Sequence, residues 1–270
     1  MKNDLQKTEL NLNAVGKGFC LAKWTQATLH LGVGLTHSCH HTKAHPIDIT
    51  KLQQTPNALH NTDRKNADRQ TMLSGNWVAD CTYCKTVEDA QAGYSDRIMK
   101  SSAEWSVVDY EKILNGKWNS DVGFPRSLEV SFSNVCNFAC AYCGPTFSSQ
   151  WIDDIDKHGP YNLGDTLYNK YRVPQIPNKD QNPYIDAFEK WLPNIIDRLY
   201  ELRITGGEPL LSKNTTKVLE MIRDGLHPNL DFAINTNACP PLTKWNDFIS
   251  LLQSIEEQKS CKSLTVYISC

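Results

Sequence analysis

The 270-residue sequence lacks the features that mark membrane proteins, secreted proteins and nucleic-acid-binding proteins. No segment approaches the roughly 18 apolar residues of a membrane span, and the polar N-terminus has no apolar stretch of a secretion signal. No run of Lys or Arg exceeds two residues and the net charge is -2, which leaves no basic footprint for nucleic acid or anionic lipid. We therefore expect a cytoplasmic protein that acts on a peptide or a small molecule, without a nucleic-acid or membrane partner.

Cysteine is the unusual part of the composition. The chain has ten cysteines in an otherwise ordinary globular composition of 40% hydrophobic and 21% charged residues. In a reducing compartment, cysteines clustered at short spacings are better explained as metal or redox ligands than as disulfides. The length suits one large or two modest domains, and we expect two.

The second half of the chain alternates strand and helix patterns. The sequence predicts strands over residues 127–132, 201–205, 230–236 and 263–269, and helices over 146–158, 185–199, 212–225 and 245–255. This order is typical of an α/β fold with parallel strands.

The first half is less regular. Alternation at Ala27, Leu29 and Leu31 before a glycine-containing turn predicts a strand that enters a hairpin. Residues 1–100 otherwise indicate a small, loop-rich domain held together by ligands, and residues 101–124 a linker helix that ends at Gly116.

Three cysteines, Cys136, Cys140 and Cys143, lie directly after the first strand of the second half. Three thiolates would leave one iron of a 4Fe-4S cluster open to a further ligand. A zinc site completed by a distant Cys or His is the alternative that the cysteines alone leave open.

The surrounding residues resemble the radical S-adenosylmethionine (SAM) superfamily. C-x-x-x-C-x-x-C follows a strand, and T-G-G-E-P at 205–209 ends the next strand. The resemblance implies a partial (β/α)6 barrel over residues 125–270 and a 4Fe-4S cluster held by the three cysteines. It also implies that Tyr142 lies near the adenine of SAM, that Gly206, Gly207 and Pro209 form a close-approach loop, and that Glu208 meets the methionine ammonium.

Three further polar residues follow the third and fourth predicted strands. Asn235, Asn237 and Ser269 are weaker candidates for SAM contacts, with strand-end capping as the alternative. In the family, a reduced cluster cleaves SAM to a 5'-deoxyadenosyl radical that abstracts hydrogen from the substrate. The glycine-rich fifth strand of that family is not found, and we expect the chain to be truncated at its C-terminus.

A second set of cysteines lies in the first half: Cys20, Cys39, Cys81 and Cys84. Residues 18–98 resemble the twitch or SPASM-type domains of radical SAM proteins, which implies an auxiliary 4Fe-4S cluster. Structural zinc and no metal are the alternatives. We expect His37, His40, His41 and His45 to be loop residues, and Cys239, Cys261 and Cys270 to be buried thiols.

The resemblance implies a radical SAM enzyme that modifies a peptide or protein and takes electrons from a flavodoxin or ferredoxin. One alternative is a radical SAM enzyme with a small-molecule substrate. The other is a metal-bearing binding protein without catalysis. Fold and cofactor motif do not decide among these.

Overall fold

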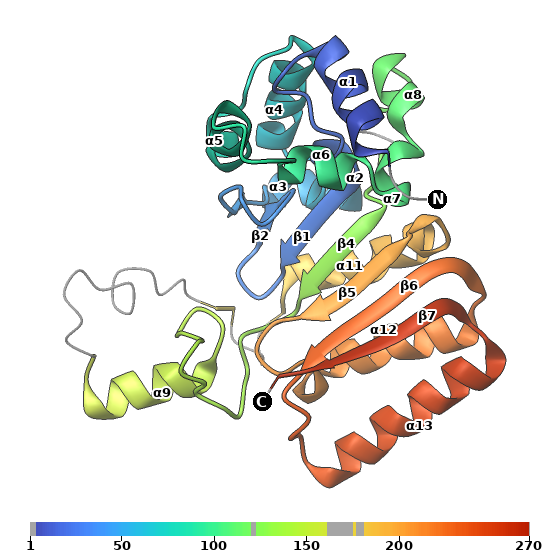
Figure 1. Cartoon of the computed structure of the whole chain (residues 1–270). Coiled ribbons are helices and arrows are strands. Elements are labelled where there is room, and N and C mark those ends of the chain that lie inside the picture. Colours follow the sequence, from blue (N-terminus) through green and yellow to red (C-terminus); the bar gives the residue numbers. More distant parts are fainter. Residues whose placement is uncertain (1–3, 120–122, 161–174, 177–180, 270) are drawn as a thin grey trace. The chain divides into compact units, whose positions relative to one another are not determined.

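The computed structural model describes residues 4–119, 123–160, 175–176 and 181–269. The chain divides into two compact units: Met1–Leu29 with Leu35–Leu128, and His30–Gly34 with Glu129–Cys270. Each unit is described by itself, and Figure 1 gives the element labels. The described elements are a mixture of helices and strands, as an α/β fold requires.

The first unit contains mostly short helices. Its elements are α1 (Leu5–Val15), α2 (Ala22–Thr25), β1 (Gln26–His30), β2 (Leu35–His37), β3 (His45–Pro46), α3 (Ile49–Leu52), the 3-10 helix η1 (Pro56–Leu59), α4 (Asp63–Leu73), the 3-10 helix η2 (Ala79–Cys81), α5 (Thr82–Asp89), α6 (Asp96–Ser101), α7 (Glu104–Val107) and α8 (Tyr110–Leu114). The strand predicted at Ala27, Leu29 and Leu31 is confirmed over its first two positions as β1, and β2 follows after a turn.

The prediction of a loop-rich domain is wrong for this unit, while its being held by ligands stays a prediction. Residues 37–69, expected to be irregular, contain α3, η1 and most of α4. Polar residues at their N-termini explain these helices: Thr62 accepts a hydrogen bond from the Lys65 amide at the start of α4. The unit also has an apolar core of its own, formed by Leu12, Phe19, Leu21, Trp24, Met72, Val78, Ile98 and Ile113.

The single linker helix predicted over residues 101–124 is also wrong. This segment forms α7 and α8, which are separated at Val108 and Asp109. Asp109 is 1% exposed, and its carboxylate accepts hydrogen bonds from the guanidinium of Arg126 at 2.7 and 2.9 Å. The buried ion pair therefore ties the break between the helices to the body of the first unit.

The second unit has the expected succession of strands and helices. Its elements are β4 (Ser127–Ser131, whose first two residues are assigned to the first unit), α9 (Ser149–His158), α11 (Pro183–Ile195), η3 (Ile196–Arg198), β5 (Glu201–Thr205), η4 (Pro209–Leu211), α12 (Lys213–Asp224), β6 (His227–Thr236), α13 (Leu242–Gln258) and β7 (Cys261–Ile268). The strands are hydrogen-bonded in the order β4-β5-β6-β7.

Parallel pairing brings the ends of these strands together. Ile204 of β5 lies opposite Ile234 of β6, and Thr236 of β6 lies opposite Ile268 of β7. The carboxyl ends of parallel strands meet at one edge of a sheet, which is where open α/β sheets bind ligands. No helix in the described part of the chain is long and apolar enough to cross a membrane.

Candidate functional site

The three-cysteine loop begins where β4 ends and is anchored to the G-G-E-P loop. The Gly207 amide donates to the Ser133 carbonyl at 3.1 Å, and the Glu208 amide donates to the Val135 carbonyl at 2.7 Å. The G-G-E segment thus lies against the residues that lead into Cys136. Sequence reasoning assigned this segment to a ligand, and these bonds give it a second role as support for the loop.

The two glycines are required by close backbone contact. A Cβ on Gly207 would lie 2.2 Å from the Val135 carbonyl oxygen, and a Cβ on Gly206 would lie 2.7 Å from the Ser131 hydroxyl. Gly206 also has a φ of +125°, which side-chain-bearing residues rarely adopt. Both positions therefore admit only glycine without a shift of residues 131–135.

Gly207→Ala is expected to displace the root of the cysteine loop, because its new methyl group would meet backbone and not a flexible side chain. We expect iron bound by Cys136, Cys140 and Cys143 to fall several-fold, as measured by iron and sulfide analysis after anaerobic reconstitution. Gly159→Ala is the control, since nothing lies within 4 Å of its added Cβ, although its backbone conformation makes the change cost about 1–3 kcal/mol. Equal iron in Gly207→Ala and wild type would contradict the close-contact argument.

The three thiols are gathered and partly shielded from solvent. Cys136, Cys140 and Cys143 are each half-buried, and the Cys143 amide donates to the Cys140 carbonyl at 2.9 Å. Burial raises the pKa of the Cys143 thiol, and the nearby Cys136 and Cys140 raise it further. The Phe138 amide donates to the Cys136 sulfur at 3.5 Å.

Helix α9 fixes the loop from its other end. Ser149 uses its hydroxyl to accept from the Cys136 amide and to donate to the Cys136 carbonyl, both at 3.1 Å. The indole of Trp151 donates to the Cys140 carbonyl at 2.9 Å. With its backbone held in this way, the loop presents three thiols for a metal centre, which fits a site-differentiated iron–sulfur cluster.

Glu208 is 2% exposed, and its carboxylate accepts hydrogen bonds from other groups of the chain. It accepts hydrogen bonds from the Leu210 amide at 2.9 Å, the Thr236 hydroxyl at 2.7 Å and the Asn237 amide at 2.7 Å. These contacts join the G-G-E-P loop to the end of β6. A direct contact between Glu208 and the methionine ammonium stays a prediction, and in the structure this side chain positions its neighbours.

The other predicted SAM contacts lie along the same edge. Tyr142 is 70% exposed, and hydrogen bonding with Cys140 raises the pKa of its phenol while a bond with Ser269 lowers it. The Ser269 amide donates to the Thr236 carbonyl at 3.0 Å, and Pro209 begins η4. The carboxamide oxygen of Asn235 is buried without a hydrogen-bond partner among the described residues, which fits a position that a ligand satisfies.

The sequence did not indicate that Asn137 and Cys239 contact each other beside the cysteine loop. The amide group of Asn137 donates to the Cys239 carbonyl at 2.7 Å, and that of Asn237 donates to the Asn137 side-chain oxygen at 2.9 Å. Cys239 is exposed and Cys261 is half-buried, so the prediction of buried thiols is wrong for both, while Cys270 lies outside the described residues. Asn137 and Cys239 are 102 positions apart, and no local pattern could have joined them.

The structure brings the second set of cysteines together in the first unit. Cys20, Cys39, Cys81 and Cys84 all line one small cavity, which Met72, Trp77 and Arg97 also line. Burial raises the pKa of Cys81 to about 12 and of Cys84 to about 11, and the neighbouring thiols of the set contribute to both shifts. Without a metal these groups are therefore neutral thiols, and a bound metal would hold them as thiolates.

Hydrogen-bond donors surround these sulfurs. Burial raises the pKa of Cys20 and Cys84, and hydrogen bonds from the backbone amides of Ala22 and Arg97 to the two sulfurs oppose that rise. The Ser101 hydroxyl lies 3.9 Å from the Cys20 sulfur. Donors of this kind stabilise the charged form of a thiol, so the donor set fits a thiolate-ligated metal centre.

One of the predicted loop histidines, His41, lines this cavity, and the ring of His40 lies against that of His41. The Nε2 atoms of His41 and His40 lie 2.9 and 3.3 Å from one carboxylate oxygen of Asp96. Three such donor atoms could in principle hold a cation. However, the Lys100 ammonium lies 3.1 Å from His40 Nδ1, and its positive charge opposes a cation there. The expectation that these histidines are not ligands is therefore kept.

Comparison with known proteins gives partial relatives. The chain is 29% identical to the GTP 3',8-cyclase of Nautilia profundicola over 110 residues, which is 41% of this chain and 27% of that protein. Identity is also 29% over 118 residues to the GTP 3',8-cyclase of Aliarcobacter butzleri, 43% of this chain and 29% of that protein. The chain thus spans less than a third of the length of these relatives. No family model and no solved structure matches.

GTP 3',8-cyclases are radical SAM enzymes. The comparisons therefore support an enzyme of this superfamily. They do not confirm the twitch or SPASM resemblance, and they give no support to peptide modification.

Proposed function

We propose that this chain belongs to a radical SAM enzyme with a small-molecule substrate. The observation that carries the proposal is the support of the Cys136–Cys143 loop by the G-G-E backbone at the carboxyl edge of parallel strands. Cys136, Cys140 and Cys143 would hold the cluster, while Asn235, Asn237 and Ser269 lie along the edge where SAM would bind. When bound, the cluster and SAM would supply a 5'-deoxyadenosyl radical for hydrogen abstraction.

The matched relatives guide the choice of substrate. Their names specify GTP, and a small-molecule substrate is compatible with the comparisons whereas modification of a peptide has no support from them. GTP is therefore the first substrate to test with this chain. A flavodoxin or ferredoxin in the cytoplasm is the proposed electron donor.

A second 4Fe-4S centre is proposed at Cys20, Cys39, Cys81 and Cys84. All four residues line one cavity of the first unit. The resemblance of residues 18–98 to twitch or SPASM-type domains favours a cluster over zinc, and ligation by four cysteines would make it a centre for electron relay or stability.

The test is a measurement of metal content and SAM cleavage. After anaerobic reconstitution we expect about eight irons per chain, four for each 4Fe-4S cluster, and release of 5'-deoxyadenosine from SAM with dithionite. Addition of GTP should increase that release, and a GTP-derived product should be detected by mass spectrometry. Stoichiometric zinc with no SAM cleavage would instead favour the metal-bearing binding protein.

A further inference from the structure

The buried charges of the first unit are strongly unbalanced. Four basic side chains of this unit are at most 4% exposed, Lys23, Lys65, Arg69 and Arg97, while the acidic residue buried to this degree in the described part of the same unit is Asp109. Asp109 lies elsewhere in the unit, paired with Arg126. Burying an uncompensated charge is costly, so an excess of buried cations indicates a negative partner.

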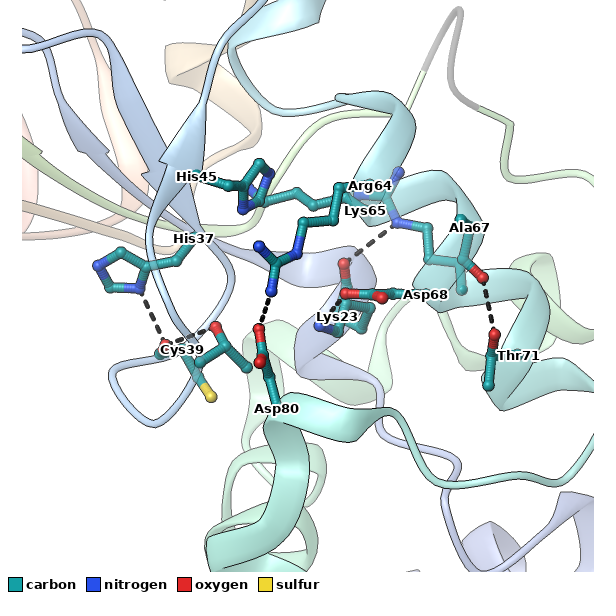
Figure 2. Close-up of polar contacts among 12 residues, drawn as sticks. Lys23, His37, Cys39, His45, Arg64, Lys65, Ala67, Asp68, Thr71 and Asp80 are labelled. Atoms are coloured by element: carbon teal, nitrogen blue, oxygen red, sulfur yellow. Dashed lines mark hydrogen bonds and ion pairs between the residues drawn. The ribbon is translucent and has the colours of Figure 1, made fainter.

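Two of the four buried cations are paired with carboxylates of the chain. Lys23 pairs with Asp68 at 2.9 Å, and Arg97 with Glu88 at 2.8 Å. Figure 2 shows the Lys23–Asp68 pair beside Lys65, and Cys39 in the same region of the unit.

In the described part of the chain, the other two buried cations, Lys65 and Arg69, donate hydrogen bonds to neutral groups. The Lys65 ammonium donates to the Thr36 hydroxyl at 3.0 Å. The Arg69 guanidinium donates to the Lys23 carbonyl at 3.1 Å and to two asparagine side chains at 2.8 Å. Among the described residues, Lys65 and Arg69 thus have no contacting carboxylate, and burial holds the pKa of the Lys65 ammonium well below its ordinary value.

Two of the four buried cations, Lys23 and Arg97, act on the cysteine cavity. Arg97 lines the cavity, and the Lys23 amide donates to the Cys20 carbonyl at 3.2 Å. Lys23 acts electrostatically on Cys81, and Arg97 acts on Cys20. A 4Fe-4S core of charge +2 held by four thiolates carries a net charge of about -2 and gains one more negative charge on reduction.

We propose that Lys23, supported by Arg97, tunes the four-cysteine centre by stabilising its reduced, more negative state. The inference rests on the second centre of the proposed function. Reduction there consists of one electron taken from an external reductant such as dithionite or a flavodoxin, without proton transfer. Removing a nearby positive charge should lower the reduction potential, and removing the carboxylate that offsets it should raise the potential.

The experiment measures the potential of this centre alone. In the full chain with Cys136, Cys140 and Cys143 replaced by alanine, redox titration followed by electron paramagnetic resonance reports one cluster. In this background, Lys23→Met should make reduction about tenfold less favourable, which is about 59 mV for one electron. Asp68→Asn should shift the potential in the opposite direction, and Lys23→Arg should retain the parent value.

Shifts of the reduction potential in opposite directions in Lys23→Met and Asp68→Asn would distinguish electrostatic tuning from simple loss of structure. Lys51→Met is the matched control, since Lys51 pairs with Asp63 at the surface with 42% of its side chain exposed. If Lys23→Met does not fold, Asp68→Asn and Lys23→Arg still decide the result. Iron at the centre with unchanged potentials would overturn the tuning alone. Zinc or no metal there would overturn both the tuning and the second centre.

Discussion

Replacement of Cys136, Cys140 and Cys143 together by alanine is expected to abolish formation of 5'-deoxyadenosine and to remove about four of about eight irons per chain. The three thiols are the side chains that the β4 loop presents as cluster ligands, and the loop backbone is held independently by Ser149 and Trp151. The fold of the second unit should therefore survive, so the loss is specific to the cluster.

Cys239→Ala is the matched control for this triple variant. Cys239 is exposed, its carbonyl accepts from Asn137, and its thiol is not among the proposed ligands. This control should retain both clusters and SAM cleavage. Iron content equal to wild type in the triple variant, or full SAM cleavage, would contradict the cluster assignment at the loop.

Replacement of Cys20, Cys39, Cys81 and Cys84 by alanine is expected to remove about four of the eight irons. It should also lower the denaturant concentration at which half of the first unit is unfolded. The four thiols come from different elements around one cavity, so a centre that they share would cross-link those elements. Loss of the centre would also leave the buried cations of this unit without their proposed partner.

Intrinsic tryptophan fluorescence in urea can follow this unit, because Trp24 is in its core. Cys261→Ala removes a half-buried thiol of the second unit and should change neither iron content nor the midpoint. The four-alanine variant should keep the three-cysteine cluster and some cleavage of SAM. Unchanged iron and an unchanged midpoint in that variant would exclude a metal centre at these residues.

Short-range patterns predicted much of the second unit. Apolar spacing gave α11, α12 and α13, and apolar runs between them gave β5, β6 and β7. The cysteine spacing and the G-G-E-P motif could be recognised from the sequence alone, because the ligands and turn residues of such loops lie close together along the chain. The first unit was predicted less well, because its short helices depend on N-terminal caps such as Thr62 more than on periodicity.

The sequence by itself determined which thiols could act as ligands and that the second half alternates strands with helices. Only the tertiary structure decided what surrounds those thiols. Glu208 meets Thr236 because parallel strands align their carboxyl ends, and Cys20 shares a cavity with Cys84 because separate segments of the first unit pack around it. Such contacts join residues tens of positions apart, where side-chain packing and not local spacing fixes the neighbours. The electrostatic effect of Lys23 likewise depends on the fold, because only the folded chain removes its charge from water.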